Sequence, residues 1–205
     1  NNLLTSVTIP DSVASVGNEA FVDNQLTSVT IPNKSISYGS GVFKRNQIAE
    51  FTIPPKMISI PPDFLNENQL TSIIIPESVR RIDEQAFANN ELISVILPDS
   101  LIIFGSYVFY GNQLTNFDLP EYLTSVPSGF VANNKLTSVT IPNSVTNIEV
   151  AAFRYNQLTS IIIPENVTKI GDEAFNGNQL TGIIIPESVI SVGGFANNLL
   201  TSVII

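Results

Sequence analysis

The chain has 205 residues, of which 13% are charged and 43% are hydrophobic, and its formal net charge is −9. The nine basic residues are scattered, so they do not supply the clustered Lys and Arg that nucleic-acid binding requires. Without His or Cys, the sequence excludes disulfides, imidazole bases, thiolate nucleophiles and the usual zinc sites, and no apolar stretch approaches the roughly 20 residues of a membrane helix. We therefore expect a folded protein with no catalytic residue, no cofactor, no metal and no membrane span.

A sequence motif of the form LTSVTIP recurs along the whole chain. It begins at Leu4 and returns at a constant spacing as far as Leu180, and only the last step, to Leu200, is shorter. Full repeats begin at residues 4, 26, 48, 70, 92, 114, 136, 158 and 180, and a partial repeat begins at 200. Such fixed self-similarity is typical of a solenoid, in which each repeat forms one coil that stacks on its neighbours. We expect residues 1–205 to form a single solenoid of nine full coils.

The first part of each coil predicts a β-strand when positions are numbered 1 to 22 from the leucine. Apolar residues at positions 4 and 6, such as Val7 and Ile9, alternate with Ser or Thr, which is the period of two of a strand. Proline follows at position 7 in all nine full coils and lacks the N–H needed to continue a ladder. Stacking then places equivalent strands side by side in one parallel sheet.

The second half of each coil has weaker signals. Apolar residues at positions 10 and 13, such as Val13 and Val16, predict a short second strand or a turn on the opposite wall. Positions 14 to 20 are too short for a stable isolated helix, so we expect one helical or 3₁₀ turn held by a phenylalanine.

An asparagine at position 21 is the most regular polar residue. It stands between the phenylalanine and the leucine of the core, so we expect its amide to turn inward and satisfy backbone groups that the coil leaves unpaired. The alternative is an exposed polar row that binds a ligand. The asparagines predicted to form this structural ladder are Asn24, Asn46, Asn68, Asn90, Asn112, Asn134, Asn156 and Asn178.

The unit LTSVTIPDSVASVGNEAFVDNQ resembles the short leucine-rich repeats of BspA-like bacterial surface proteins, whose pattern runs L-x-x-I-x-I-P-x-x-V-x-x-I-G-x-x-A-F. The resemblance extends over essentially all of the chain. It implies a leucine-rich-repeat solenoid, α/β horseshoe-like and rich in β-structure, and an extracellular or cell-surface location. The chain departs from many members of the family by carrying Asn-Gln where they carry Cys before the next leucine.

A longer period of three coils is superimposed on the first six coils. Coil 2 matches coil 5, and coils 3 and 6 share Phe51 and Phe117 at position 4. We interpret residues 70–135 as a duplicate of residues 4–69.

Coils 3 and 6 also invert the usual order of a small and a large residue at positions 17 and 18, for example as Phe64-Leu65. Close-packed cores tolerate changed residues best when the total volume is kept. We therefore expect these two coils to be locally reshaped.

Carboxylates are the remaining candidates for chemistry. Neighbouring coils place position 8 about 4.8 Å apart, so a row of acidic residues there could hold a cation. The simpler interpretation is that these residues cap turns and keep the surface soluble, because the sequence does not place several oxygen ligands close together as a cation site requires. The acidic residues at position 8 are Asp11, Glu77, Asp99, Glu121, Glu165 and Glu187.

The outward positions 3 and 5 of the strand form the expected binding surface, by analogy with solenoids that bind along such a sheet. Most of these side chains are small and neutral, and the exceptions point to recognition around Asp118, while isoleucines at position 5 add an apolar stripe. The candidate ligand-binding residues are Glu50, Thr52, Ser72, Ile74, Ser94, Ile96, Asn116, Asp118, Ser138 and Thr140.

Two kinds of function remain. The first is a non-catalytic cell-surface or secreted module that binds a protein or glycan of a host or neighbouring cell through the strand face. The second is a structural spacer or an ice-binding solenoid that presents rows of hydroxyls, although Ile interrupts the Thr row in half of the coils.

Both ends of the chain carry the sequence NNLLTSV without a polar cap. We therefore expect either that this chain is a fragment flanked by further sequence or that molecules associate end to end.

Overall fold

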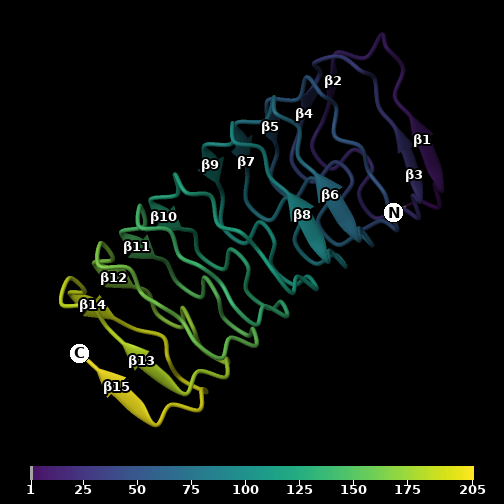
Figure 1. The fold of residues 1–205 in the computed structure, drawn as a ribbon. Coiled ribbons are helices and arrows are strands. Elements are labelled where there is room, and N and C mark those ends of the chain that lie inside the picture. Colours follow the sequence, from purple (N-terminus) through teal and green to yellow (C-terminus); the bar gives the residue numbers. More distant parts are fainter. Residues whose placement is uncertain (1) are drawn as a thin grey trace. The chain divides into compact units, whose positions relative to one another are not determined.

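A computed structural model describes residues 2–205, and in this range the chain forms fifteen short β-strands and no helix. It divides into two compact units, Asn1–Gln113 with coils 1 to 5 and Leu114–Ile205 with the later coils. Equivalent strands of consecutive coils pair in parallel, as Ser6 with Ser28 in unit 1 and Ser125 with Asn147 in unit 2. Each unit is therefore a parallel β-solenoid with one repeat per coil, which confirms the predicted fold class (Figure 1).

The predicted strand at positions 3 to 5 forms one side of each unit, called here the first wall. In unit 1 the pairs are β1 with β3 and β6 with β8, and in unit 2 β13 pairs with β15. Position 4 points inward, so Ile73 and Ile183 are buried, whereas the residues on either side face solvent. The first-wall strands are β1 (Ser6–Thr8), β3 (Ser28–Thr30), β6 (Ser72–Ile74), β8 (Ser94–Ile96), β13 (Gly182–Ile184) and β15 (Ser202–Ile204).

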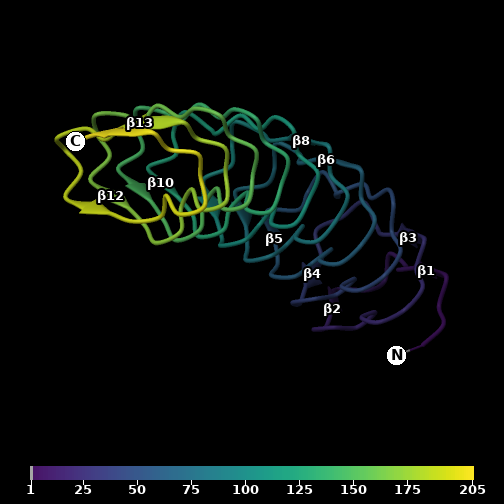
Figure 2. The same ribbon diagram turned by 90° about the horizontal axis from the view of Figure 1, so that it is seen from below.

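Two-residue strands at positions 12 and 13 form the opposite side, called here the second wall. They pair as β2-β4 and β5-β7-β9 in unit 1 and as β10-β11-β12-β14 in unit 2. The chain of each coil thus runs around an interior that the core side chains fill (Figure 2). The second-wall strands are β2 (Ser15–Val16), β4 (Ser37–Tyr38), β5 (Ser59–Ile60), β7 (Arg81–Ile82), β9 (Ile103–Phe104), β10 (Ser125–Val126), β11 (Asn147–Ile148), β12 (Lys169–Ile170) and β14 (Ser191–Val192).

The segment between the second wall and the next leucine differs from the expected helical or 3₁₀ turn. Residues 2–205 contain neither kind of helix, and the segment forms non-helical turns. Two residues per coil have a positive φ, at positions 16 and 20, as shown by Glu19 (55°), Asp23 (54°), Ala151 (57°) and Tyr155 (52°). A left-handed residue interrupts the run of right-handed dihedrals that any helical turn needs, so the chain bends twice instead.

Ladders of identical side chains fill the interior of both units. Phe87 and Phe109 stack at 6.0 Å in unit 1, and Phe153 and Phe175 stack at 5.3 Å in unit 2. Full burial of one such ring stabilises the fold by about 1.5–3 kcal/mol. The phenylalanines with less than 2% exposure are Phe43, Phe64, Phe87, Phe109, Phe130, Phe153 and Phe175.

Coil 3 is the one coil of unit 1, within the described residues, whose first-wall segment is not a strand, over residues 50–52. Its Phe51 packs edge-on against Phe64, with ring centroids 5.7 Å apart and planes at 90°. In unit 2, Phe117 meets Phe130 in the same way, at 5.6 Å and 89°. The two coils thus share one ring geometry, and coil 3 differs from the other coils of unit 1 by lacking the first-wall strand. Coil 6 also lacks a first-wall strand, but so do coils 7 and 8.

Tyr38, at position 13 of coil 2, carries a buried hydroxyl that has no hydrogen-bond partner among residues 2–205. Its ring packs edge-on against Phe64 at 5.3 Å, and burial raises the pKa of the hydroxyl to about 12. We predict that Tyr38→Phe raises the free energy of unfolding by about 1 kcal/mol at pH 7, because it removes a desolvated, unpaired group. Coil 5 already carries Phe104 at this position.

Urea unfolding followed by circular dichroism measures this effect. Because the folded pKa of Tyr38 lies above the unfolded value near 10, the tyrosine protein loses stability as the pH rises from 10 towards 12, and the variant does not share this loss. Tyr155→Phe, at an exposed tyrosine, serves as the control and should change stability by less than about 0.5 kcal/mol. A destabilised Tyr38→Phe protein would contradict the prediction.

Candidate functional site

The outward face of the first wall changes character along unit 1. Position 5 holds exposed threonines in coils 1 to 3, then Ile74 and Ile96 in coils 4 and 5. These two isoleucines pair directly in the β6–β8 ladder and are 65% and 59% exposed. Side chains alternate across a strand, so the fold itself holds them in solvent. Unit 1 therefore presents a polar segment followed by an apolar one.

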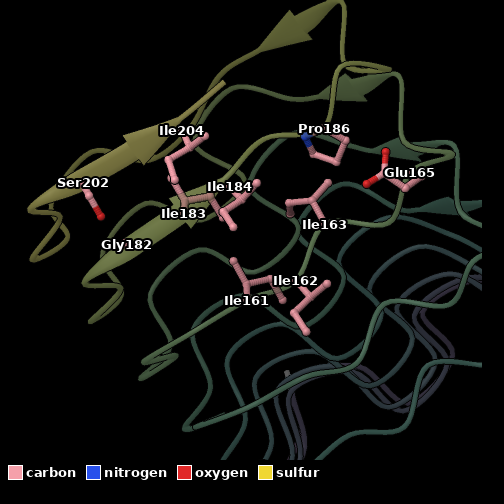
Figure 3. Close-up of a pocket in the computed structure, with 10 residues that line it drawn as sticks. All are labelled: Ile161, Ile162, Ile163, Glu165, Gly182, Ile183, Ile184, Pro186, Ser202 and Ile204. Atoms are coloured by element: carbon pink, nitrogen blue, oxygen red, sulfur yellow. The ribbon is translucent and has the colours of Figure 1, made fainter.

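The same change occurs in unit 2. Position 5 holds Asp118 and Thr140, then Ile162, Ile184 and Ile204, which are 84%, 65% and 59% exposed. The last three border a shallow open hollow on coils 8 to 10, called here the isoleucine hollow. Figure 3 shows these side chains on three successive coils, with Ser202 towards one end of the hollow. Its lining residues are Ile161, Ile162, Ile163, Glu165, Gly182, Ile183, Ile184, Pro186, Ser202 and Ile204.

Gly182 lies in the lining of this hollow. It stands at position 3, where most coils carry serine, and a Cβ there would lie 2.9 Å from the Ser202 hydroxyl oxygen. A side chain at position 182 would therefore crowd Ser202, whereas glycine fits beside the serine of the next coil.

A second hollow lies on the first wall of unit 1, between coils 2 and 3. It is bordered by Ser28, Thr30, Glu50, Phe51 and Thr52, and it opens where residues 50–52 leave the sheet. Its lining combines hydroxyls and the Glu50 carboxylate with Phe51 and prolines. It is therefore more polar than the isoleucine hollow, although part of its lining is apolar.

All ten predicted binding residues are exposed on the first wall, but the structure divides them between the units. Six lie in unit 1, from Glu50 to Ile96, and four lie in unit 2, from Asn116 to Thr140. Asp118, where recognition was expected, lies in coil 6, whereas the isoleucine hollow lies in coils 8 to 10. The predicted set does not include Ile162, Ile184 or Gly182, which line the hollow, although the isoleucines at position 5 of three consecutive coils are visible in the sequence.

The asparagines of position 21 are turned into the coil. From Asn24 to Asn198, each Oδ1 accepts a hydrogen bond from the backbone N–H at position 1 of the same coil, at 3.0 to 3.3 Å. Each Nδ2 donates to backbone carbonyls, as Asn156 does to Val131 and Phe153 of adjacent coils. These amides therefore join consecutive coils, and they offer no free group to a ligand.

The charged groups form isolated pairs. Arg45 donates hydrogen bonds to Asp23, and with its positive charge it lowers the pKa of that carboxyl. The acidic residues of position 8 are exposed, and in residues 2–205 no group of three carboxylates is close enough to hold a metal ion. A helix able to cross a membrane is absent from the same range.

Comparisons with known proteins agree on the type of repeat. A family model described as the BspA type leucine rich repeat region matches residues 1–111 and 82–201, in six copies. No curated protein sequence gives a significant match.

Solved bacterial structures are similar over nearly the whole chain. A leucine-rich repeat protein from Bacteroides ovatus has a TM-score of 0.75 at 20% identity, covering 97% of this chain and 56% of that one. One from Eubacterium ventriosum has a TM-score of 0.60 at 21% identity, covering 98% and 66%. A leucine rich cell surface protein from Faecalibacterium prausnitzii has a TM-score of 0.57 at 20% identity, covering 98% and 79%. The chain thus spans less than two thirds of the first two proteins, and at these identities the likeness shows the fold.

Proposed function

Because this chain belongs to the BspA-type leucine-rich repeat family, we propose that it is a non-catalytic binding module of a bacterial cell-surface protein and that it captures a protein partner on the outward face of the first wall. Two structural neighbours support the location, since one is named a cell surface protein and another a pneumococcal vaccine antigen. Solenoids of stacked repeats bind along such extended faces.

The exposed isoleucines of position 5 are the main support for this proposal. Ile162 is 84% exposed and Ile184 is 65% exposed, although other coils of the same fold carry threonine at this position. The scaffold therefore does not require isoleucine there. Burying such a side chain against a partner contributes about 1.5–3 kcal/mol, whereas leaving it in water contributes nothing to stability. A row of exposed isoleucines that the fold does not need favours a protein ligand over a glycan.

The isoleucines also argue against an ice-binding face, which needs an uninterrupted row of hydroxyls. In each unit the position-5 row changes from polar to isoleucine. Thermal hysteresis of the purified chain would measure any residual activity of this kind.

The double substitution Ile162→Thr with Ile184→Thr tests the proposal, because threonine occupies position 5 in other coils. We would screen the 205-residue chain against a displayed library of extracellular protein domains and against a glycan array. A protein partner is expected, and the double variant should bind it at least about tenfold more weakly, equivalent to about 1.4 kcal/mol.

Ile190→Thr is the matched control, since Ile190 is 87% exposed but lies on the second wall at position 11. It should leave the affinity unchanged. A partner held equally well by the double variant, or signals on the glycan array alone, would overturn the proposal.

A further inference from the structure

The second wall of unit 1 carries exposed basic and apolar side chains that we call the second-wall patch. Ile58, Ile102 and Ile103 are 62%, 67% and 44% exposed, and the basic side chains are exposed as well. Its residues lie in, or just before, the strands β5, β7 and β9 of the second wall, and these strands are labelled in Figure 1. It consists of Lys56, Ile58, Arg80, Arg81, Ile102 and Ile103.

Backbone hydrogen bonds fix the order of these side chains. The N–H of Arg80 donates to the carbonyl of Ile58 at 2.8 Å, and the N–H of Ile102 donates to the carbonyl of Arg80 at 2.9 Å. Position 11 therefore forms one row across three coils, with the arginine between two isoleucines. In the adjacent row, Arg81 pairs with Ile103 in the β7–β9 ladder.

Unit 2 shows which other residues the fold accepts at position 11. There the row holds Thr124, Thr146, Thr168 and Ile190, and the hydroxyls of Thr146 and Thr168 donate to the carbonyl of the preceding coil at 3.1 and 3.2 Å. These two threonines stabilise the wall. In unit 1 the side chains of Ile58 and Ile102 cannot make such bonds, so they do not have this structural role.

The basic groups of the patch are unusual in an acidic chain. At least five of the nine basic residues form salt bridges with carboxylates, among them Arg81 with Asp83. Lys56 and Arg80 have no carboxylate within salt-bridge distance in the described part of the chain, and the Arg80 guanidinium donates to the backbone carbonyl of Glu77. Two positive charges without a carboxylate partner thus belong to the same patch as exposed isoleucines, in a molecule of net charge −9.

We propose that the second-wall patch binds an acidic amphipathic helix of a protein partner, on a surface separate from the first-wall face. Neighbouring strands lie about 4.8 Å apart. One helical turn rises about 5.4 Å, whereas same-side residues of an extended strand lie about 6.7 Å apart. A helix crossing the three strands can therefore place an apolar, an acidic and an apolar side chain over Ile58, Arg80 and Ile102.

Charge complementarity favours the patch as the docking place of this partner. An acidic helix is repelled by most of a chain that carries −9, so the patch is the favourable place for it to dock. A second copy of this chain is not the occupant, because its residues 2–205 contain no helix.

The test uses the full 205-residue chain and a fluorescent synthetic helix of about 20 residues, long enough to be helical in water. One face of the peptide carries Ile and Glu one turn apart, and a control peptide carries Lys in place of Glu. Fluorescence anisotropy should show binding of the Glu peptide only, weakening as salt is raised. The variant Ile58→Thr with Arg80→Thr, which installs the threonine found in unit 2, should bind at least about tenfold more weakly.

The first-wall variant Ile162→Thr with Ile184→Thr is the matched control and should bind the peptide as the unmodified chain does. Circular dichroism should show the same unfolding curve for the patch variant, because both substituted side chains are exposed. Failure of the Glu peptide to bind, or equal binding by the patch variant, would overturn the proposal. Retention on vesicles of phosphatidylglycerol and phosphatidylcholine that the patch variant loses would instead assign the patch to an anionic lipid surface.

Discussion

Replacing Asn90 with aspartate is expected to lower the free energy of unfolding by about 3 kcal/mol at pH 7, because it leaves buried backbone groups without partners. The Nδ2 of Asn90 donates to the carbonyls of Leu65, Phe87 and Ala88 at 2.9, 3.2 and 3.2 Å, and its Oδ1 accepts from the Leu70 N–H at 3.0 Å. A carboxylate of nearly the same shape keeps the acceptor but turns a negative oxygen towards three carbonyl oxygens. Its side chain has little access to water, since Asn90 is 7% exposed.

The loss should depend on pH. Burial and the facing carbonyls both disfavour the charged form, so the folded pKa of the introduced carboxyl lies above its unfolded value of about 3.9. Stability is then retained below that unfolded value and lost as the pH rises through the folded one. The difference from the unmodified chain should be larger at pH 7 than at pH 4, as measured by urea unfolding with circular dichroism at both values.

Asn33→Asp is the matched control for this experiment. Asn33 is exposed at position 8, where coils 1 and 5 already carry aspartate. Its substitution should change stability by less than about 0.5 kcal/mol at either pH. A ladder variant that behaves like this control would show that the asparagines of position 21 do not hold the coils together.

The strands were predictable from the sequence because their signals are local. The period of two around Val7 and Ile9, ended by a proline, determines which side chains face inward in every coil. The turns were not predictable in the same way. Their left-handed residues include Glu19, Tyr107 and Ala151, whereas the usual sequence signal for a positive φ is glycine. Coils 7 and 8 lack the first-wall strand although their repeats carry the same strand pattern as the paired coils, so the pattern of a single repeat does not predict these breaks.

Features of the surface that depend on stacking were also hidden in the sequence. Arg80 and Arg81 count only among the scattered basic residues of the sequence, because Ile58 and Ile102 belong to the preceding and following repeats and are distant from Arg80 along the chain. Only the β5-β7-β9 ladder places them beside it. The isoleucine hollow similarly has lining residues from three repeats, and the β13–β15 pair places Gly182 opposite Ser202.

Phe64→Ala is expected to be among the most damaging truncations in unit 1, costing about 4–5 kcal/mol. The Phe64 side chain is fully buried, and its ring lies 5.3 Å from Tyr38, 5.4 Å from Phe43 and 5.7 Å from Phe51, all at steep angles. Such edge-on pairs contribute about 0.5–1.5 kcal/mol each beyond burial. Because residues 50–52 lack strand pairing, we expect this aromatic cluster to add to the β5–β7 pairing and the backbone hydrogen bonds in holding coil 3 to its neighbours.

Phe87→Ala provides the comparison, because Phe87 is equally buried but stacks on Phe109 alone among the described rings, in a coil whose first-wall strand is paired. It should cost about 3–4 kcal/mol, within the range for a truncated core phenylalanine. Phe64→Leu should recover roughly half of the loss at position 64, since it restores volume but not the ring edges. If urea unfolding gave equal losses for the two alanine variants, the ring contacts would be incidental to burial. Coil 3 would then be held by the same ladder of core side chains as every other coil.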